Sequence, residues 1–437
     1  MFNADKNLME KWAPIMESDQ APAFKDAHRR AVTAVMLENT EKALAEQRGH
    51  ESFNLQEAAP VNATGSGVDN WDPILISLVR RSMPNLMAYD IAGVQPMTGP
   101  TGLIFAMKSK YTSQSGTEAL FAEANTAFSG ATSGDLGSAD AGNNDPFAGD
   151  DPASGGSVGT DSDTVNEYQP GSGNTTAVAE AQVAAADIPQ MAFSIDKTTV
   201  TAKSRALKAE YTTELAQDLK AVHGLSAETE LANILSTEIL AEMNREIIRT
   251  INVNSVTSTR GAAAGVWNMD VAADTDGRWS IEKFKGLVQA MEQEANQIAV
   301  STRRGKGNWA IVSHGVAAAL NAAGVMDTGM GALGAQQMDS DVTGSLLAGT
   351  INGSMKVYVD PYAGVDYFTV GYKGANPYDA GMFFCPYVPL SMMKTIGEND
   401  FQPRIGFKTR YGMADNPFVT AGAGANVYYR KRKVLNL

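Results

Sequence analysis

Residues able to carry catalysis are scarce in this sequence. It contains one cysteine, Cys385. The four histidines are His28, His50, His223 and His314. Only His314 follows a candidate nucleophile, Ser313, and neighbouring residues on a strand point to opposite faces of a sheet. No G-x-S-x-G motif surrounds Ser313, so the pattern does not favour a hydrolase.

Two further patterns could bind ligands. Gly329–Gly334 (GMGALG) has the G-x-G-x-x-G spacing of a dinucleotide-binding loop, but no strand is expected before it and no helix after it. The clusters Asp145–Asp151 and Asp161–Asp163 could offer carboxylate oxygens to calcium, but they lack the EF-hand spacing. A mobile Gly-rich loop and a solvated acidic surface are the favoured interpretations. We therefore expect no cofactor and no bound metal.

A short pattern, [L/I]-x-E, recurs near the start of the chain. It occurs six times, and four of these lie within the first 57 residues. The fourth, Leu55-Gln56-Glu57, is followed by the small Ala58 and by the linker-like segment Asn62–Gly67 (NATGSG). Exposed linkers are preferred sites of proteolysis. The pattern is also common in amphipathic helices, so the spacing alone leaves both interpretations open.

Charge is distributed unevenly along the 437 residues. The formal net charge of −14 argues against a general nucleic-acid binder. Residues 1–57 contain 10 acids and 7 bases, whereas residues 111–196 contain 13 acids and no Lys or Arg. Such asymmetry is typical of separable modules. A membrane-spanning helix needs a run of at least about 18 apolar residues, and no such run occurs. The first residues lack the apolar core of a secretory signal.

Hydrophobic periodicity predicts an α+β fold. Two amphipathic helices are expected before residue 57, the second beginning at Pro22. Strands are expected on both sides of the acidic segment, at Gly102–Tyr111 and Ala192–Ala202. We expect Thr201–His223 and Ala227–Val253 to be helices, the second roughly 40 Å long.

The longer of these helices has an apolar stripe that includes Leu235 and Ile239 and is widened by Ile234 and Ile248. The last third of the chain is expected to alternate between helices and strands. The expected elements are a helix at Ile281–Ala299, a strand at Trp309–Val312, a helix at Val316–Ala323, a hairpin at Gly349–Val359 with its turn at Asn352-Gly353, and strands at Tyr367–Tyr372 and Gly381–Tyr387. The run Arg430–Lys433 is interpreted as a solvated strand edge protected by charge.

Five stretches carry a resemblance to a known family. They are Leu78–Met97 (LVRRSMPNLMAYDIAGVQPM), Ala202–Gly224 (AKSRALKAEYTTELAQDLKAVHG), Asn244–Ile248 (NREII), Tyr367–Gly374 (YFTVGYKG) and Gly406–Gly412 (GFKTRYG). In this order they resemble the major capsid proteins of T-even-like tailed bacteriophages (myoviruses). The resemblance implies the HK97-like capsid fold and covers most of the chain after Trp71.

The resemblance also implies a division of the chain into parts. These are a helical propeptide removed on maturation (1–57), an N-terminal arm and the start of the peripheral domain (58–100), an E-loop (101–200) carrying an insertion domain (about 112–190), a peripheral domain with a long spine helix (201–255), an axial domain (256–395) and a return to the peripheral domain (396–437).

The function implied is that of a structural protein, not an enzyme. Copies would assemble into hexameric capsomers and a capsid lattice, forming an icosahedral or prolate head in the host bacterial cytoplasm. The head would enclose double-stranded DNA without sequence-specific binding. The implied partners are a vertex protein, a portal, a scaffold, a prohead protease and decoration proteins. No membrane partner is implied.

The family's protease cuts after [L/I]-x-E, which carries over to Leu55, Gln56 and Glu57, with the cut before Ala58.

Two other classes of protein remain open. One is a cellular surface or adhesion protein with an acidic, calcium-binding module. The other is a nicotinamide-dependent enzyme, which depends on Gly329–Gly334 alone.

Overall fold

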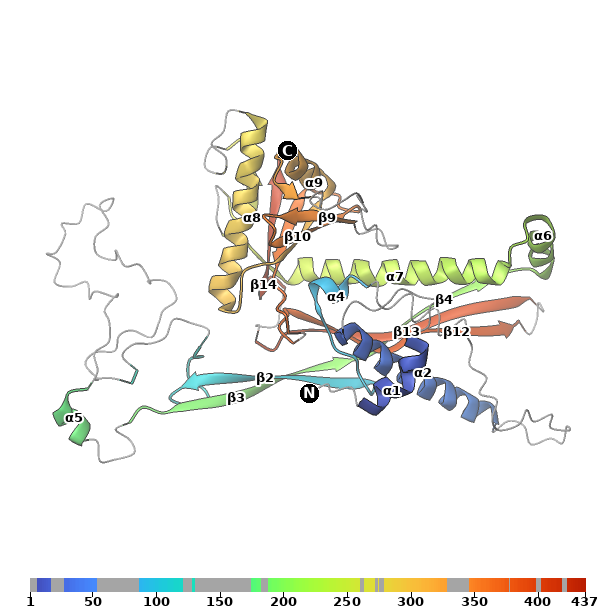
Figure 1. Cartoon of the computed structure of the whole chain (residues 1–437), viewed down its shortest axis with the longest axis horizontal. Coiled ribbons are helices and arrows are strands. Elements are labelled where there is room, and N and C mark those ends of the chain that lie inside the picture. The colour runs from blue at the N-terminus through green and yellow to red at the C-terminus, as the bar shows by residue number, and fades with distance from the viewer. Residues whose placement is uncertain are drawn as a thin grey trace. The chain divides into compact units, whose positions relative to one another are not determined.

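The computed structural model describes residues 6–16, 27–52, 86–120, 128–129, 174–181, 188–259, 263–271, 274, 279–327, 346–376, 378–397, 402–418 and 423–437. The chain divides into two compact units (Figure 1). The first comprises Met1–Ile104, Thr198–Val300 and Arg304–Leu437, and the second comprises Phe105–Lys197 with Ser301–Arg303.

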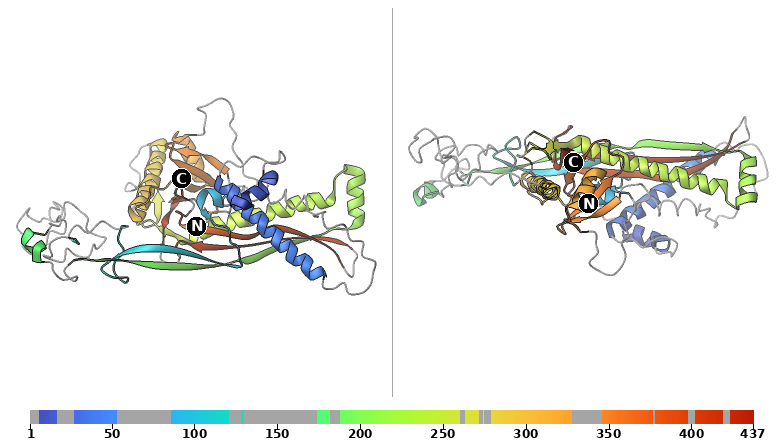
Figure 2. Two further views of the ribbon diagram at one scale, coloured as in Figure 1. Left: turned by 60° about the horizontal axis from the view of Figure 1, so that its bottom comes forward. Right: turned by 90° about the horizontal axis from the view of Figure 1, so that it is seen from above.

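A four-stranded sheet and one long helix form the base of the first unit. The strands, in spatial order, are β1 (Gly93–Val94), β12 (Met382–Ile396), β13 (Pro403–Asp415) and β4 (Lys203–Glu210). Helix α7 (Ala227–Asn254) runs along this sheet (Figures 1 and 2). Its Ile239, Met243, Ile247 and Ile251 are fully buried in the main core. The predicted long helix is therefore confirmed, and so is the burial of Ile248.

Two parts of the helix prediction in this region were wrong. Ile234 points to solvent and is 61% exposed, and Leu235 is only partly buried. The segment expected to be a helix from Thr201 instead forms strand β4, which pairs antiparallel with β13. Only its second half is helical, as α6 (Thr213–His223).

Helix α6 has a residue typical of a helix end at each terminus. The Thr212 side chain accepts a hydrogen bond from Leu215 N at 3.2 Å and caps the first turn. Gly224 adopts φ 68°, the left-handed conformation that commonly terminates a helix. The predicted stop at Gly224 is confirmed.

A second, eight-stranded sheet belongs to the same unit. Its strands are β5 (Ser255–Thr257), β14 (Asn426–Leu435), β11 (Tyr367–Gly371), β7 (Trp309–Ser313), β10 (Met355–Asp360), β9 (Leu346–Ile351) and β8 (Met326–Asp327) in spatial order, with β6 (Val266–Asn268) paired to β14. Helices α8 (Ser280–Thr302) and α9 (His314–Ala322) pack against this sheet. Apolar residues of α8, α9, β7, β10 and β11 form one buried cluster.

The predicted hairpin turn in this sheet is confirmed. Strands β9 and β10 pair antiparallel around Asn352 and Gly353, whose φ angles are 50° and 65°. Two consecutive positive φ angles are the signature of the type I′ turn, which matches the twist of the strands it joins.

The charged run near the end of the chain was misread. Strand β14 lies inside the sheet between β11 and β5, so it is not a free edge. Arg432 is 3% exposed, and its Nε lies 3.2 Å from Oε1 of the fully buried Glu294 on α8. Arg430 Nη1 lies 3.2 Å from Oε2 of the same carboxylate. Residues two apart on a strand share a face, which directs both guanidinium groups to one acid.

The helices before residue 57 also pack in the first unit. Helix α1 is Lys6–Met16 and α2 is Ala27–Ser52, and the short α4 spans Ala88–Ile91. Trp12, Met16, Val32, Met36 and Leu37 are buried in the main core. Two helices were expected here, and the described part of this segment contains two, although the predicted start at Pro22 lies outside it.

The second unit contains most of a two-stranded hairpin. Its strands are β2 (Thr101–Tyr111) and β3 (Met191–Thr201), which confirms both predicted strands, and helix α5 spans Thr176–Ala181. Most of the acidic segment between the strands lies outside the described residues.

Strand β12 pairs with β13 in the four-stranded sheet, whereas β14 pairs with β11 in the eight-stranded sheet. The division of the chain that the resemblance implies stays a prediction. Across the described ranges, the helices are all too short or too polar to cross a membrane.

Candidate functional site

The predicted cleavage site, Leu55, Gln56, Glu57 and Ala58, lies outside the described residues. So do Gly329–Gly334 and both aspartate clusters. These interpretations stay predictions. Helix α2, which precedes the predicted cut in the sequence, is described as far as Ser52.

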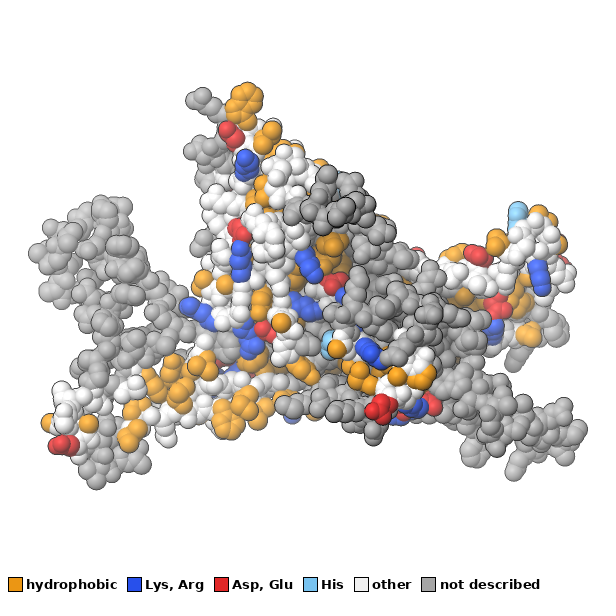
Figure 3. Space-filling model, in the orientation of Figure 1, with side chains coloured by type: hydrophobic (Ala, Val, Ile, Leu, Met, Phe, Trp, Pro, Cys, Tyr) orange, Lys and Arg blue, Asp and Glu red, His pale blue; other side chains and the backbone are white. Residues whose placement is uncertain are grey.

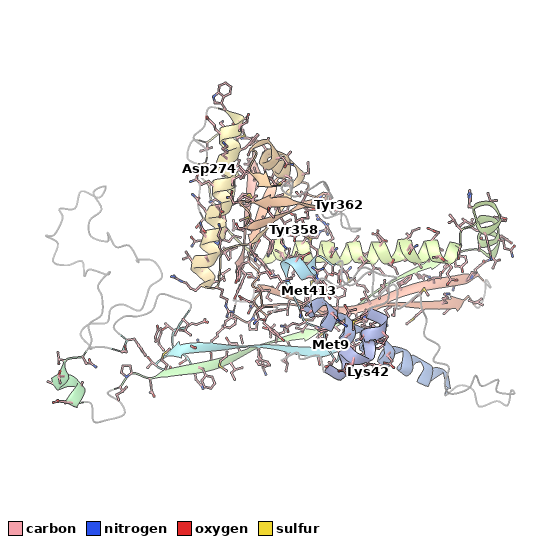
Figure 4. The ribbon with its side chains drawn as sticks, viewed as in Figure 1. Met9, Lys42, Asp274, Tyr358, Tyr362 and Met413 are labelled. Carbon is pink, nitrogen blue, oxygen red and sulfur yellow. The ribbon has the colours of Figure 1, made fainter. Side chains whose placement is uncertain are left out.

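Helix α1 is fastened to α2 by one cluster of charged residues. Lys11 Nζ lies 3.0 Å from Glu38 Oε2 and 2.5 Å from Glu41 Oε2, and Trp12 Nε1 donates to Glu38 Oε2 at 3.3 Å. Burial disfavours the Glu38 carboxylate, but the hydrogen bonds from Lys11 and Trp12 prevail and lower its pKa. Met9 and Lys42, labelled in Figure 4, mark the two adjoining helices.

The Ser313–His314 pair has a structural role. Ser313 Oγ accepts a hydrogen bond from Val316 N at 3.4 Å and donates one to Asp366 Oδ1 at 2.7 Å. The serine is therefore the N-cap of α9, and His314 is its exposed first residue. The hydroxyl is committed to the helix and to Asp366, so this pair is not arranged for nucleophilic catalysis.

The charged groups beneath α7 are also mutually engaged. Arg205 Nη1 lies 3.2 Å from Glu242 Oε2, and Nη2 lies 2.5 Å from Glu246 Oε2. Tyr411 donates its hydroxyl to Glu246, and burial together with this carboxylate raises the Tyr411 pKa. Arg205, Glu242 and Glu246 line an open cavity of about 430 Å³. Nowhere in the described ranges do three or more His, Cys, Asp or Glu side chains gather as metal ligands.

The β2–β3 hairpin has two chemically different faces. Backbone hydrogen bonds at its two ends, Ala202 N to Pro100 O and Thr112 N to Gln190 O, fix the register. Even-numbered residues of both strands then share one face, which the 2.8 Å ion pair between Lys108 and Asp196 marks. Odd-numbered residues of both strands share the other face.

The odd-numbered face is apolar and exposed. Six large side chains on it are between 54% and 71% exposed: Leu103, Phe105, Met107, Met191, Phe193 and Ile195. Hydrophobic side chains are visible along the hairpin in Figure 3. We refer to these six residues as the apolar hairpin face. This face was not predicted, although the period-2 alternation of the six residues was a readable signal.

Comparison with known proteins assigns the class. The family model "Major capsid protein Gp23" matches residues 68–434. The major capsid protein of Serratia phage KSP90 is 39% identical, with 99% of this chain and 98% of that protein covered. The major capsid protein of Enterobacteria phage T4 is 35% identical, with coverages of 96% and 93%. The solved structure "The capsid of Myoviridae Phage XM1" aligns with 78% of this chain and 90% of its own at a TM-score of 0.37 and 10% identity.

The family model and the two relatives define a structural protein of a phage head. More narrowly, the chain belongs to the Gp23 family of major capsid proteins. The resemblance that the five sequence stretches carried is thereby confirmed, and the family is not an enzyme family.

Proposed function

We propose that copies of this chain assemble through the apolar hairpin face into hexameric capsomers of an HK97-like lattice, which encloses double-stranded DNA. The observation that carries the proposal is the exposure of six large apolar side chains on one face of β2–β3. A contiguous apolar surface is unfavourable in water and usually marks a protein interface. In a major capsid protein the most abundant neighbour is another copy.

The opposite hairpin face supports this direction of assembly. It carries the Lys108–Asp196 ion pair, and its Ala106 and Val200 are already buried within the chain. The hairpin therefore has one face that is largely covered within the chain and one apolar face that is left exposed for a neighbour. The vertex protein, portal, scaffold and decoration proteins would then add to a lattice whose main contacts are between copies of this chain.

Charge placed on the apolar hairpin face tests the proposal. Met107→Glu and Phe193→Glu should each prevent particle assembly, because a buried unpaired carboxylate is costly. Gln114→Glu adds the same charge at an exposed position beyond β2 and should assemble normally. Electron microscopy of the expressed proteins distinguishes closed shells or tubes from small particles. Normal shells from both Met107→Glu and Phe193→Glu would contradict assembly through this face.

Maturation by cleavage is the second part of the proposal. The [L/I]-x-E motif at Leu55-Gln56-Glu57 supports a cut before Ala58. N-terminal sequencing of mature heads should therefore begin Ala58-Ala59-Pro60, and Glu57→Gln should leave the precursor intact. A mature protein that begins elsewhere would refute this site while leaving the assembly proposal unaffected.

A further inference from the structure

Asn39 on α2 joins two segments that are distant in sequence. Its side chain is 6% exposed, and its Nδ2 lies 2.8 Å from Met97 O and 2.9 Å from Tyr387 O. A primary amide carries two N–H groups, so one side chain can donate both hydrogen bonds at once. Asn39 thus satisfies two main-chain carbonyls with a single side chain.

Those carbonyls lie where two paired segments separate. Gly93 and Val94 pair parallel with Phe383 and Phe384. The pairing continues as Gln95 N donates to Phe384 O at 2.9 Å and Met97 N donates to Pro386 O at 2.8 Å. Four residues after Met97 the chain enters β2 at Thr101. We call residues 93–97 and 383–387 the hairpin root.

Other residues of α2 hold the same segment. His28 Nε2 lies 3.1 Å from Val94 O. Arg29 Nη2 lies 2.9 Å from Asp90 Oδ1, and its guanidinium carbon lies 5.0 Å from the centre of the Tyr89 ring. Each of these contacts joins a residue before the predicted cut to a residue after it.

We propose that α2 is a built-in clamp on the hairpin root, and that cutting the chain after Glu57 releases the clamp. The second half rests on the cleavage proposed above. While the chain is intact, α2 and the root are tethered and meet at a high effective concentration. After the cut, the same contacts hold only a separate fragment, which dilution removes. The root carbonyls then lose the Asn39 donors, and the strand leading into the hairpin gains freedom.

Cys385 offers a direct measure of root opening. It is the only cysteine in the sequence, is 2% exposed, and lies in one buried cluster with Met97 and Val200. A thiol in this position reacts with a maleimide only when the root opens. Its labelling rate therefore reports the state of the clamp without any need for capsid assembly.

The first experiment removes the clamp without cutting. Asn39→Leu is introduced into the full chain that also carries Glu57→Gln, and Cys385 labelling is expected to accelerate about tenfold. Asn233→Leu makes the same change at an exposed position on α7 and should leave the rate unchanged. Ile239→Ala controls for general loss of stability and should not accelerate labelling as much. An unchanged rate in a folded Asn39→Leu protein would overturn the clamp.

The second experiment cuts without substituting Asn39, and it decides the question where Asn39→Leu fails to fold. A recognition sequence for a site-specific protease replaces residues 54–59 in the full chain. After cutting, gel filtration should separate the α1–α2 fragment, and labelling of Cys385 should accelerate about tenfold. A fragment that stays bound, or one that leaves with no change in labelling, refutes release.

The two proposals fail in different ways. If heads mature at another position while both labelling experiments give the expected result, the Glu57 cut is wrong and the clamp stands. If mature heads begin at Ala58 but labelling never changes, the cut stands and the clamp is wrong.

Discussion

Arg245 on α7 forms a 2.5 Å ion pair with Asp360 at the end of β10, and this carboxylate is 1% exposed. The aspartate also accepts hydrogen bonds from Tyr362 N at 3.0 Å and from the Tyr367 hydroxyl at 2.7 Å. The Arg245 guanidinium lies 5.4 Å from the centre of the Tyr362 ring, which Figure 4 labels. The ion pair therefore connects the long helix to the eight-stranded sheet.

Removal of this arginine should be costly. Arg245→Ala leaves the Asp360 carboxylate buried with two hydrogen bonds and no cation, and the free energy of unfolding should fall by about 3 kcal/mol. Arg249→Ala, one turn further along α7 at an exposed position, should change it by less than about 0.5 kcal/mol. Denaturant unfolding of the purified subunit measures both. Equal losses would mean that the ion pair does not secure the helix.

The two faces of α7 can be compared with one residue type. Ile239→Ala should cost about 2–5 kcal/mol, because it leaves a cavity in the main core. Ile234→Ala, at a side chain that is largely exposed, should change stability by less than about 0.5 kcal/mol. The same unfolding measurement applies, and a loss at Ile234 as large as that at Ile239 would show that the buried face has been assigned wrongly.

Local signals in the sequence were sufficient for some elements. The Asn352-Gly353 turn and the stop at Gly224 depend on backbone conformations that few residues adopt, so the residue types revealed them. Strand β4 was misread because Lys203–Glu210 consists largely of good helix formers, and its pairing with β13, about 200 residues away, overrides that propensity. The residue types of a short segment do not indicate which distant strand it pairs with.

The same limit applied to Arg432 and to the apolar hairpin face. Arg432 looked like a solvated cation because its partner, Glu294, lies on a different element and far away in sequence. The apolar hairpin face was readable as alternation at Phe105 and Met107, but its meaning depends on the facing strand. The [L/I]-x-E motif at Glu57 was recognised through family resemblance, since three residues alone do not specify a cut.

Close packing of Trp309 against β11 gives a third prediction. A Cβ on Gly371 would overlap the buried Trp309 indole, so Gly371→Ala should destabilise the chain by about 1–3 kcal/mol. Gly364 has open space where its Cβ would lie, and Gly364→Ala should be neutral within about 0.5 kcal/mol. Thermal unfolding of the two alanine variants compares them. A neutral Gly371→Ala would show that the indole can move aside.

The thiol of Cys385 gives a prediction about pH. Burial raises its pKa from 9.0 to about 12 in the folded chain. The thiol of the unfolded chain ionises at lower pH than that of the folded chain. Its contribution to stability is therefore complete below pH 9 and is lost as pH rises towards 12, at up to about 1.4 kcal/mol per pH unit.

Comparison with Cys385→Ala isolates this contribution from those of the tyrosines and lysines that titrate in the same range. The variant loses stability by a similar amount at every pH, because the small cavity left by the sulfur does not titrate. The slope is therefore the informative quantity. Between pH 8 and 11, the free energy of unfolding should fall more steeply for the wild-type chain than for Cys385→Ala. Parallel profiles would mean that the thiol already meets solvent in the folded chain, contrary to its burial beside Met97 and Val200.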